Sequence, residues 1–117
     1  MNILVRTDHN IDGSAELNEY INENLSEVLE RFKSLITRVE VHLSDENAGK
    51  TGGMDKRCLI EARLANHNPV IIRHNANSIH QVINESASKL LRSIGNIVDR
   101  STSRTGLSEF TESQESI

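Results

Sequence analysis

A Gly-Lys-Thr triplet at residues 49–51 is the first stretch of the sequence whose residue types could bind a nucleotide. A phosphate-binding loop requires the pattern G-x-x-x-x-G-K-[S/T] and a helix beginning at the lysine, because backbone amides at a helix N-terminus surround the phosphates. Position 44, where the first glycine would stand, holds serine, and two glycines that disfavour a helix follow the triplet. We therefore interpret residues 44–56 as a long connection between two strands. Its Lys50 and Lys56, and Arg57 directly after it, can still contact phosphate.

Histidine and cysteine are the other residue types that could carry chemistry. None of the five histidines forms an i,i+4 helical pair or stands near a C-x-x-C motif, so we expect solvated side chains rather than a metal site. The single cysteine, Cys58, excludes an intrachain disulfide, and its position in a strand pattern indicates a buried thiol. No carboxylate pair, triad or cofactor motif is present, so we predict no enzyme, no cofactor and no small-molecule substrate.

The strongest binding candidate is a row of cations near the C-terminal end of the sequence, at Lys89, Arg92 and Arg100. Residues 56–100 hold 7 Lys and Arg against 3 Asp and Glu, whereas residues 1–55 hold 5 against 11. A split of this size predicts a polarised surface in spite of the net charge of −4. The alternative is structural, because cations are also favoured at the negative end of a helix.

Two helices are predicted from apolar residues that recur every three or four positions. The first follows Ser14, a typical N-cap, and carries an acidic outer face. The second begins at Ser78, which has the S-x-x-Q capping-box spacing with Gln81. The expected buried positions are Leu17, Ile21, Leu25, Val28 and Phe32 in the first helix, and Ile79, Ile83, Ala87, Leu90, Ile94 and Ile97 in the second.

Four strands are predicted, over residues 2–6, 36–44, 57–65 and 70–74. Residues 36–44 alternate, so that Thr37, Val39, Val41 and Leu43 should face inward. Residues 57–65 alternate in the same way, with Cys58, Ile60, Ala62 and Leu64 facing inward. The order βαβββα predicts an α+β fold in which one four-stranded sheet carries both helices on one face. The open face should then carry Arg38, Glu40, His42, Arg57, Glu61, Arg63 and Arg73.

Length and composition predict one domain over residues 1–100, followed by a disordered Ser/Thr/Glu-rich tail over 101–117. No run approaches the roughly 18–20 apolar residues of a membrane span. The N-terminal residues are too polar for a signal peptide. The expected location is the cytoplasm.

The same order of elements resembles the ribosome hibernation factors, the family of hibernation-promoting factor and ribosome-associated inhibitor A. The Lys89 and Arg92 positions match a K-L-x-R pattern in that family's final helix. The similar stretches are "NILVRTDHNIDGSAELNEYINENLSEVLERF" (2–32), "ITRVEVHLS" (36–44) and "NSIHQVINESASKLLRSI" (77–94).

The resemblance implies a fold like that of double-stranded RNA-binding domains and binding to 16S rRNA of the small ribosomal subunit, in the channel for mRNA and tRNA. It also implies that the protein blocks translation under stress or in stationary phase. The predicted RNA-binding residues are Lys89, Arg92, Arg100, Arg57, Arg63, Arg73, Lys50 and Lys56. The alternative, suggested by the acidic first helix, is a protein-interaction module of the same fold that no longer binds ribosomes.

Overall fold

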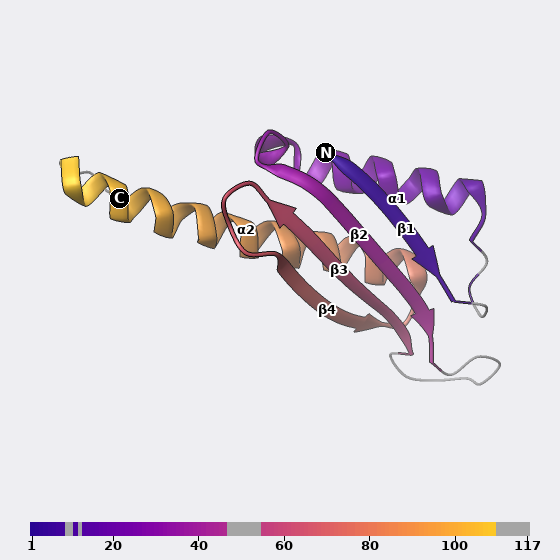
Figure 1. The fold of residues 1–117 in the computed structure, drawn as a ribbon. Coiled ribbons are helices and arrows are strands. Elements are labelled where there is room, and N and C mark those ends of the chain that lie inside the picture. Colours follow the sequence, from indigo (N-terminus) through magenta and orange to yellow (C-terminus); the bar gives the residue numbers. More distant parts are fainter. Residues whose placement is uncertain (9–10, 12, 47–54, 110–117) are drawn as a thin grey trace.

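The computed structural model describes residues 1–8, 11, 13–46 and 55–109, and only the backbone beyond residue 100. The elements are β1 (Asn2–Thr7), α1 (Ala15–Val28), the 3-10 turn η1 (Glu30–Phe32), β2 (Ile36–Asp45), β3 (Lys56–Leu64), β4 (Val70–Ala76) and α2 (Ile79–Glu109). Figure 1 shows one sheet with both helices behind it. The α+β fold with the order βαβββα is therefore confirmed.

The sheet is mixed, with the strand order β1-β2-β3-β4. β2, β3 and β4 form the expected antiparallel meander, whereas β1 pairs parallel to β2. The parallel pair requires a crossover, which α1 supplies by passing behind the sheet (Figure 1). Pro69 precedes β4, an edge strand, where its missing N–H costs no ladder bond.

The predicted N-caps form as expected. The Ser14 hydroxyl accepts a hydrogen bond from the Leu17 amide at 3.1 Å, and the Ser78 hydroxyl accepts one from the Gln81 amide at 3.2 Å. Each bond satisfies an amide that the first helical turn would otherwise leave without a partner. The two polar residues therefore fix where the helices begin.

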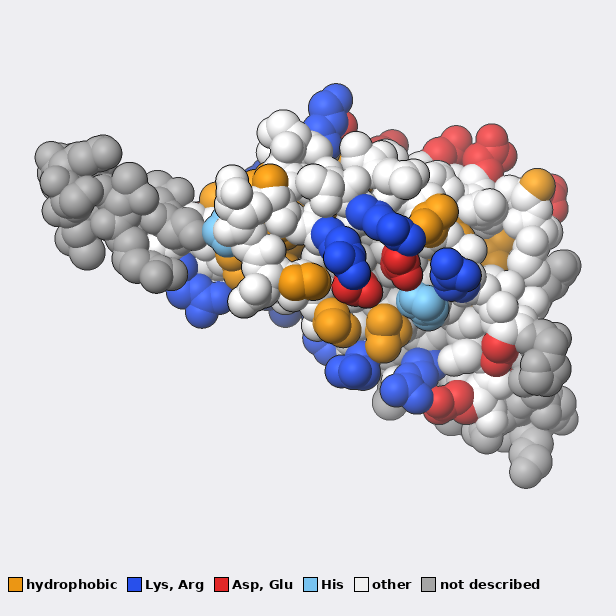
Figure 2. All heavy atoms as spheres, in the orientation of Figure 1, with side chains coloured by type: hydrophobic (Ala, Val, Ile, Leu, Met, Phe, Trp, Pro, Cys, Tyr) orange, Lys and Arg blue, Asp and Glu red, His pale blue; other side chains and the backbone are white. Residues whose placement is uncertain are grey.

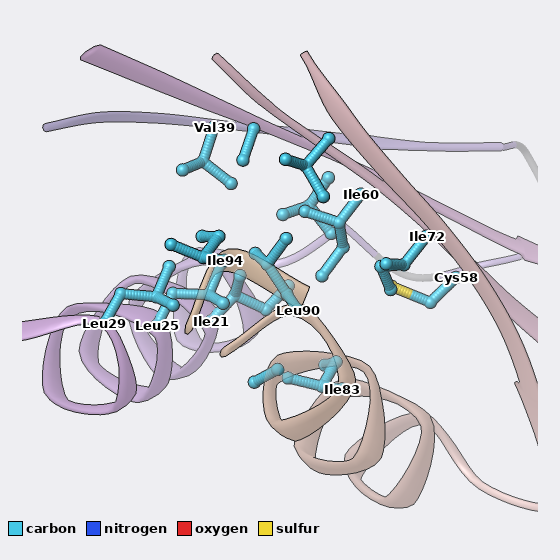
Figure 3. Close-up of a cluster of buried hydrophobic side chains, with 14 of the residues drawn as sticks. Ile21, Leu25, Leu29, Val39, Cys58, Ile60, Ile72, Ile83, Leu90 and Ile94 are labelled. Atoms are coloured by element: carbon cyan, nitrogen blue, oxygen red, sulfur yellow. The ribbon is translucent and has the colours of Figure 1, made fainter. Parts of the chain in front are cut away.

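The core lies between the sheet and the two helices. Figure 3 shows Ile21, Leu25 and Leu29 of the α1 region meeting Leu90 and Ile94 of α2 beneath the sheet. The expected inward residues of β3 are all buried, and so are Val39, Val41 and Leu43 of β2. Most of the predicted helix residues are buried, whereas four are half-buried against the core: Leu17, Val28, Ile79 and Ile97. Leu29, Val82 and Ser86 are buried although they were not predicted, because each helix packs against both the sheet and the other helix and so buries a wider stripe.

Thr37 corrects one expectation about β2. It was predicted to face inward but is exposed, and Ile36 is buried beside the core in its place. The pairing with β3 shifts between Ile36 and Arg38, so Thr37 is an extra residue in a β-bulge. Its hydroxyl donates to the Arg63 carbonyl oxygen at 3.0 Å.

Helix α2 is longer than the sequence predicted. It continues through Glu109 and extends past the sheet (Figure 1), so residues 101–109 of the expected disordered tail are helical. A helix that is already formed extends at little cost, because each added residue gains one backbone hydrogen bond. Residues 110–117 lie outside the described part, and the division into a domain and a tail stays a prediction. Within the described residues, no helix combines the length and the apolar character needed to cross a bilayer.

Candidate nucleic-acid interface

Helix α2 presents Lys89 and Arg92 on its exposed side. The two residues are three positions apart and therefore neighbours on one helix face. The opposite face carries Val82, Ile83, Ala87, Leu90 and Ile94, all buried against the sheet and α1. Burial of this apolar face fixes the rotation of the helix, and with it the direction in which the two cations point.

The two cations lie beside the edge strand β4. The ammonium group of Lys89 donates a hydrogen bond to the backbone carbonyl of Arg73 at 2.9 Å. A shallow hollow between β4 and α2 is lined by His74, Asn84, Glu85, Ser88, Lys89 and Arg92. Lys89 and Arg92 therefore lie beside the strand that carries Arg73, although 16 positions separate Lys89 from Arg73 in the sequence.

Glu85 is the one acidic residue that lines this hollow. Its carboxylate lies 2.7 Å from Nε2 of His74 and also accepts a hydrogen bond from Gln81 at 3.2 Å. The hydrogen bond with His74, and then that from Gln81, lowers the pKa of Glu85 below its usual value. The carboxylate is therefore held in its charged form in the hollow that Lys89 also lines.

The open face of the sheet carries the expected charged residues. The strand register places Arg38, Glu40 and His42 of β2, Arg57, Glu61 and Arg63 of β3, and Arg73 of β4 on the side away from the helices. Figure 2 views this face and shows the cations arranged around a small acidic centre. The acidic centre consists of Glu40 and Glu61, which lie directly opposite each other on β2 and β3.

Ion pairs divide the predicted sheet cations into two groups. Arg63 pairs with Glu61 at 3.4 Å, and Arg57 pairs with Glu46 at 2.7 Å. Arg73 is exposed and makes no ion pair with any described residue. Exposed pairs of this kind contribute little free energy and exchange readily for a phosphate partner, so Arg57 and Arg63 remain able to bind an anion.

Three predicted residues stand apart from this surface. Lys56 is held between Asp45 at 3.4 Å and Asp55 at 3.2 Å, and its hydrogen bond to Asp55 raises its pKa. Lys56 therefore stays charged, and two carboxylates already balance its charge. Arg100 is exposed but lies about 16 Å beyond Lys89 along the helix axis, at 1.5 Å per residue. Lys50 lies outside the described residues.

Arg6 belongs to the open face but was not among the predicted residues. It is exposed on β1, opposite His42 of β2. Arg6 was not predicted because it lies in the half of the sequence where acidic residues outnumber cations. The alternation within the first strand could have identified it, since Ile3 and Val5 contact the core and Arg6 points the other way.

The strands on either side of the Gly-Lys-Thr triplet argue against a nucleotide site there. β2 and β3 pair antiparallel along their whole length. A phosphate-binding loop leads instead from a strand into a helix. The triplet itself, at residues 49–51, lies outside the described part of the chain.

Cys58 is buried, as predicted. Burial raises the pKa of its thiol to about 11, partly offset by the neighbouring Ser86 hydroxyl. A thiol with this pKa is protonated at neutral pH and is a poor nucleophile. Across the described residues, the structure contains no cluster of three or more His, Cys, Asp or Glu side chains that could hold a metal ion.

The solved structures that share the fold include the two described here. The Thermus thermophilus Protein Y N-terminal domain has a TM-score of 0.67 and 20% identity, over 83% of this chain and 99% of that chain. A ribosomal subunit interface protein from Coxiella burnetii has a TM-score of 0.69 and 12% identity, over 85% of this chain and 99% of that chain. No curated protein sequence matches the chain.

Membership in a family is decided by the sequence itself. Residues 4–102 match the family model described as sigma 54 modulation protein / S30EA ribosomal protein. The match begins within β1 and ends in the last third of α2. The resemblance drawn from the sequence patterns is thereby confirmed. The chain belongs to the sigma 54 modulation protein / S30EA ribosomal protein family.

Proposed function

We propose that this protein binds 16S rRNA of the small ribosomal subunit, in the channel for mRNA and tRNA, and blocks translation under stress or in stationary phase. The protein would act in the cytoplasm without catalysing a reaction. Phosphate groups would be its main contacts, because lysine and arginine side chains gain affinity by releasing the counterions condensed on RNA.

The observation that carries this proposal is the meeting of two cationic sets at β4. Lys89 and Arg92 flank the strand edge from α2, and Arg73 flanks it from the open face of the sheet. Within the described residues, β4 has a strand neighbour on only one side, so no further strand covers this edge. A phosphate backbone that crosses this edge can therefore contact cations on both sides of it.

The test is co-sedimentation with purified small ribosomal subunits and whole ribosomes at low and moderate salt. We expect the protein to pellet with both particles at low salt and to be released as salt rises. The variant Lys89→Glu plus Arg92→Glu should remain in the supernatant. Both positions are exposed, so circular dichroism should show an unchanged fold.

The matched control is Arg31→Glu plus Lys33→Glu, the same change of charge at exposed positions beside η1. This control should still pellet, because it lies away from β4. Failure of the natural sequence to pellet at low salt would contradict the proposal, as would equal loss in both double variants. Recovery of one basic protein without rRNA would instead favour the protein-interaction alternative, with the acidic face of α1 as the contact.

A further inference from the structure

One cross-strand row spans the whole open face of the sheet. Arg6 of β1, His42 of β2, Leu59 of β3 and Arg73 of β4 are consecutive partners in the strand register. The row covers three strand spacings, so its two arginines are about 14 Å apart at the backbone. Both arginines are exposed, and neither makes an ion pair with a described residue.

Charge is distributed unevenly along this face. The neighbouring rows hold Glu40 and Glu61, and the register also places Arg38 opposite Arg63. Each glutamate pairs with the arginine of its own strand, two positions away, and Glu40 also lies 3.4 Å from Nε2 of His42. These contacts involve neither Arg6 nor Arg73. The two arginines that end the row therefore keep their positive charge.

Apolar surface accompanies these cations. Ile71 of β4 is 51% exposed, an unusual value for a large aliphatic side chain, and it lies two positions from Arg73 in the sequence. Ile71 pairs with Glu61 of β3 in the strand register, so it lies on the open face, where Leu59 is half-buried. Figure 2 shows hydrophobic side chains among the cations of this face. A shallow hollow near the end of β1 is lined by two arginines and one carboxylate among other side chains: Arg6, Thr7, Asp8, His42, Leu43, Ser44, Arg57 and Leu59.

The type of cation on this face points to a particular ligand. Every Lys or Arg at its outward strand positions is arginine: Arg6, Arg38, Arg57, Arg63 and Arg73. A guanidinium group is planar, stacks on aromatic faces and forms paired hydrogen bonds with phosphate, whereas an ammonium group acts as a point charge. Unpaired RNA bases offer such faces, and a paired A-form helix keeps its bases stacked inside. Single-stranded RNA therefore fits both the charge and the apolar surface.

We propose that the open face of the sheet binds unpaired RNA nucleotides along this row. Arg6 and Arg73 contact bases and phosphates at its two ends, and the imidazole of His42 and the side chain of Leu59 lie beneath the bases between them. A four-stranded sheet of this width accommodates two or three stacked bases. The inference deepens the proposed ribosome binding, because it assigns unpaired nucleotides to the sheet in addition to the phosphate contacts of α2.

The test compares the full chain with the variant Arg6→Lys plus Arg73→Lys, which keeps the charge and removes both planar groups. Fluorescence anisotropy measures binding to a labelled, unstructured RNA strand and to an RNA duplex of equal length. We expect the variant to bind the single strand about tenfold more weakly, consistent with the loss of stacking. Duplex affinity should stay within about twofold, and the slope of affinity against salt should not change, because the charge is unchanged.

Arg31→Lys is the matched control, because it makes the same change of residue type at an exposed position in η1, outside this face. It should bind both RNAs within about twofold of the natural sequence. A second variant, Ile71→Thr, keeps a β-branched residue in β4 and should weaken single-strand binding several-fold. Wild-type affinity of the double arginine variant for the single strand would overturn the inference, and so would an equal loss for the duplex.

Two further measurements test the oligomeric state and the proposed function separately. Light scattering on the same samples reports any dimer. If RNA affinity changed only in variants whose oligomeric state also changed, the face would be assigned to a second copy of the chain, and the inference would be overturned. Co-sedimentation with small subunits tests the proposed function independently. Ribosome binding with no effect of Arg6→Lys plus Arg73→Lys on single-strand affinity refutes the inference alone. Arginine-dependent single-strand binding without ribosome binding refutes the proposed function alone.

Discussion

Lys89 and Arg73 are joined by a hydrogen bond from the lysine ammonium group to the arginine backbone carbonyl, at 2.9 Å. The bond ties the middle of α2 to the outer edge of β4. It also occupies an edge carbonyl that would otherwise be available to another strand. The Arg73 side chain leaves the same backbone toward the open face, so one contact unites the helix cations with the sheet cations.

Lys89→Gln should weaken ribosomal RNA binding by a similar factor for every RNA sequence tested. The lost phosphate contact should lower the slope of log affinity against log salt by about one. The free energy of unfolding should fall by less than about 1.5 kcal/mol, because a single exposed hydrogen bond is lost. Anisotropy titrations from about 50 mM to about 200 mM salt measure the slope. Lys33→Gln is the control, and an equal change of slope in that variant would assign the effect to net charge.

Glu85→Gln should change how stability depends on pH. The hydrogen bond with His74 lowers the pKa of Glu85, so the charged carboxylate stabilises the fold above its unfolded pKa of about 4.3. That contribution is lost as pH falls through the lower folded pKa. Urea unfolding at a series of pH values should therefore show a difference between the two proteins at neutral pH that disappears in acid. A constant difference at all pH values would contradict this.

Cys58 should be unreactive in the folded protein. Its pKa of about 11 leaves almost no thiolate at neutral pH, and the side chain is buried. A disulfide reagent should label it only after unfolding in denaturant.

The raised pKa of Cys58 also predicts how stability depends on alkaline pH. Because the folded pKa is above the unfolded pKa of about 8.5, Cys58 should reduce stability as pH rises from about 8.5 toward the folded pKa. Cys58→Ala should remove that part of the alkaline loss. Rapid labelling under native conditions would show that the thiol is accessible.

Ser14→Ala should destabilise the fold by about 1 kcal/mol, the usual effect of removing an N-cap oxygen. The hydroxyl accepts the Leu17 amide at the start of α1, and alanine leaves that amide without its partner. The midpoint of urea unfolding measures the loss. Ser26→Ala is the control, since Ser26 is exposed within the same helix and alanine is favoured there. An unchanged midpoint in Ser14→Ala would mean that water replaces the cap.

The elements themselves were predictable because their signals are local. Alternation in β3 identified its buried residues, and Ser14 and Ser78 marked the helix starts. The strand prediction failed at Thr37, where a bulge inserts one residue and changes which side chains face inward. A bulge depends on how two strands pair, and pairing is not recorded in the alternation of one strand.

The sequence by itself determined the order of the elements, the face of α2 that carries Lys89 and Arg92, and the cations of the sheet's open face in β2, β3 and β4. Only the tertiary structure decided where these cations lie relative to one another. The parallel pairing of β1 with β2 brought Arg6 into a row with Arg73, and packing of α2 beneath β4 brought Lys89 to the Arg73 carbonyl. Both relationships join residues far apart in the chain, and they depend on register and packing, which arise only when the elements meet.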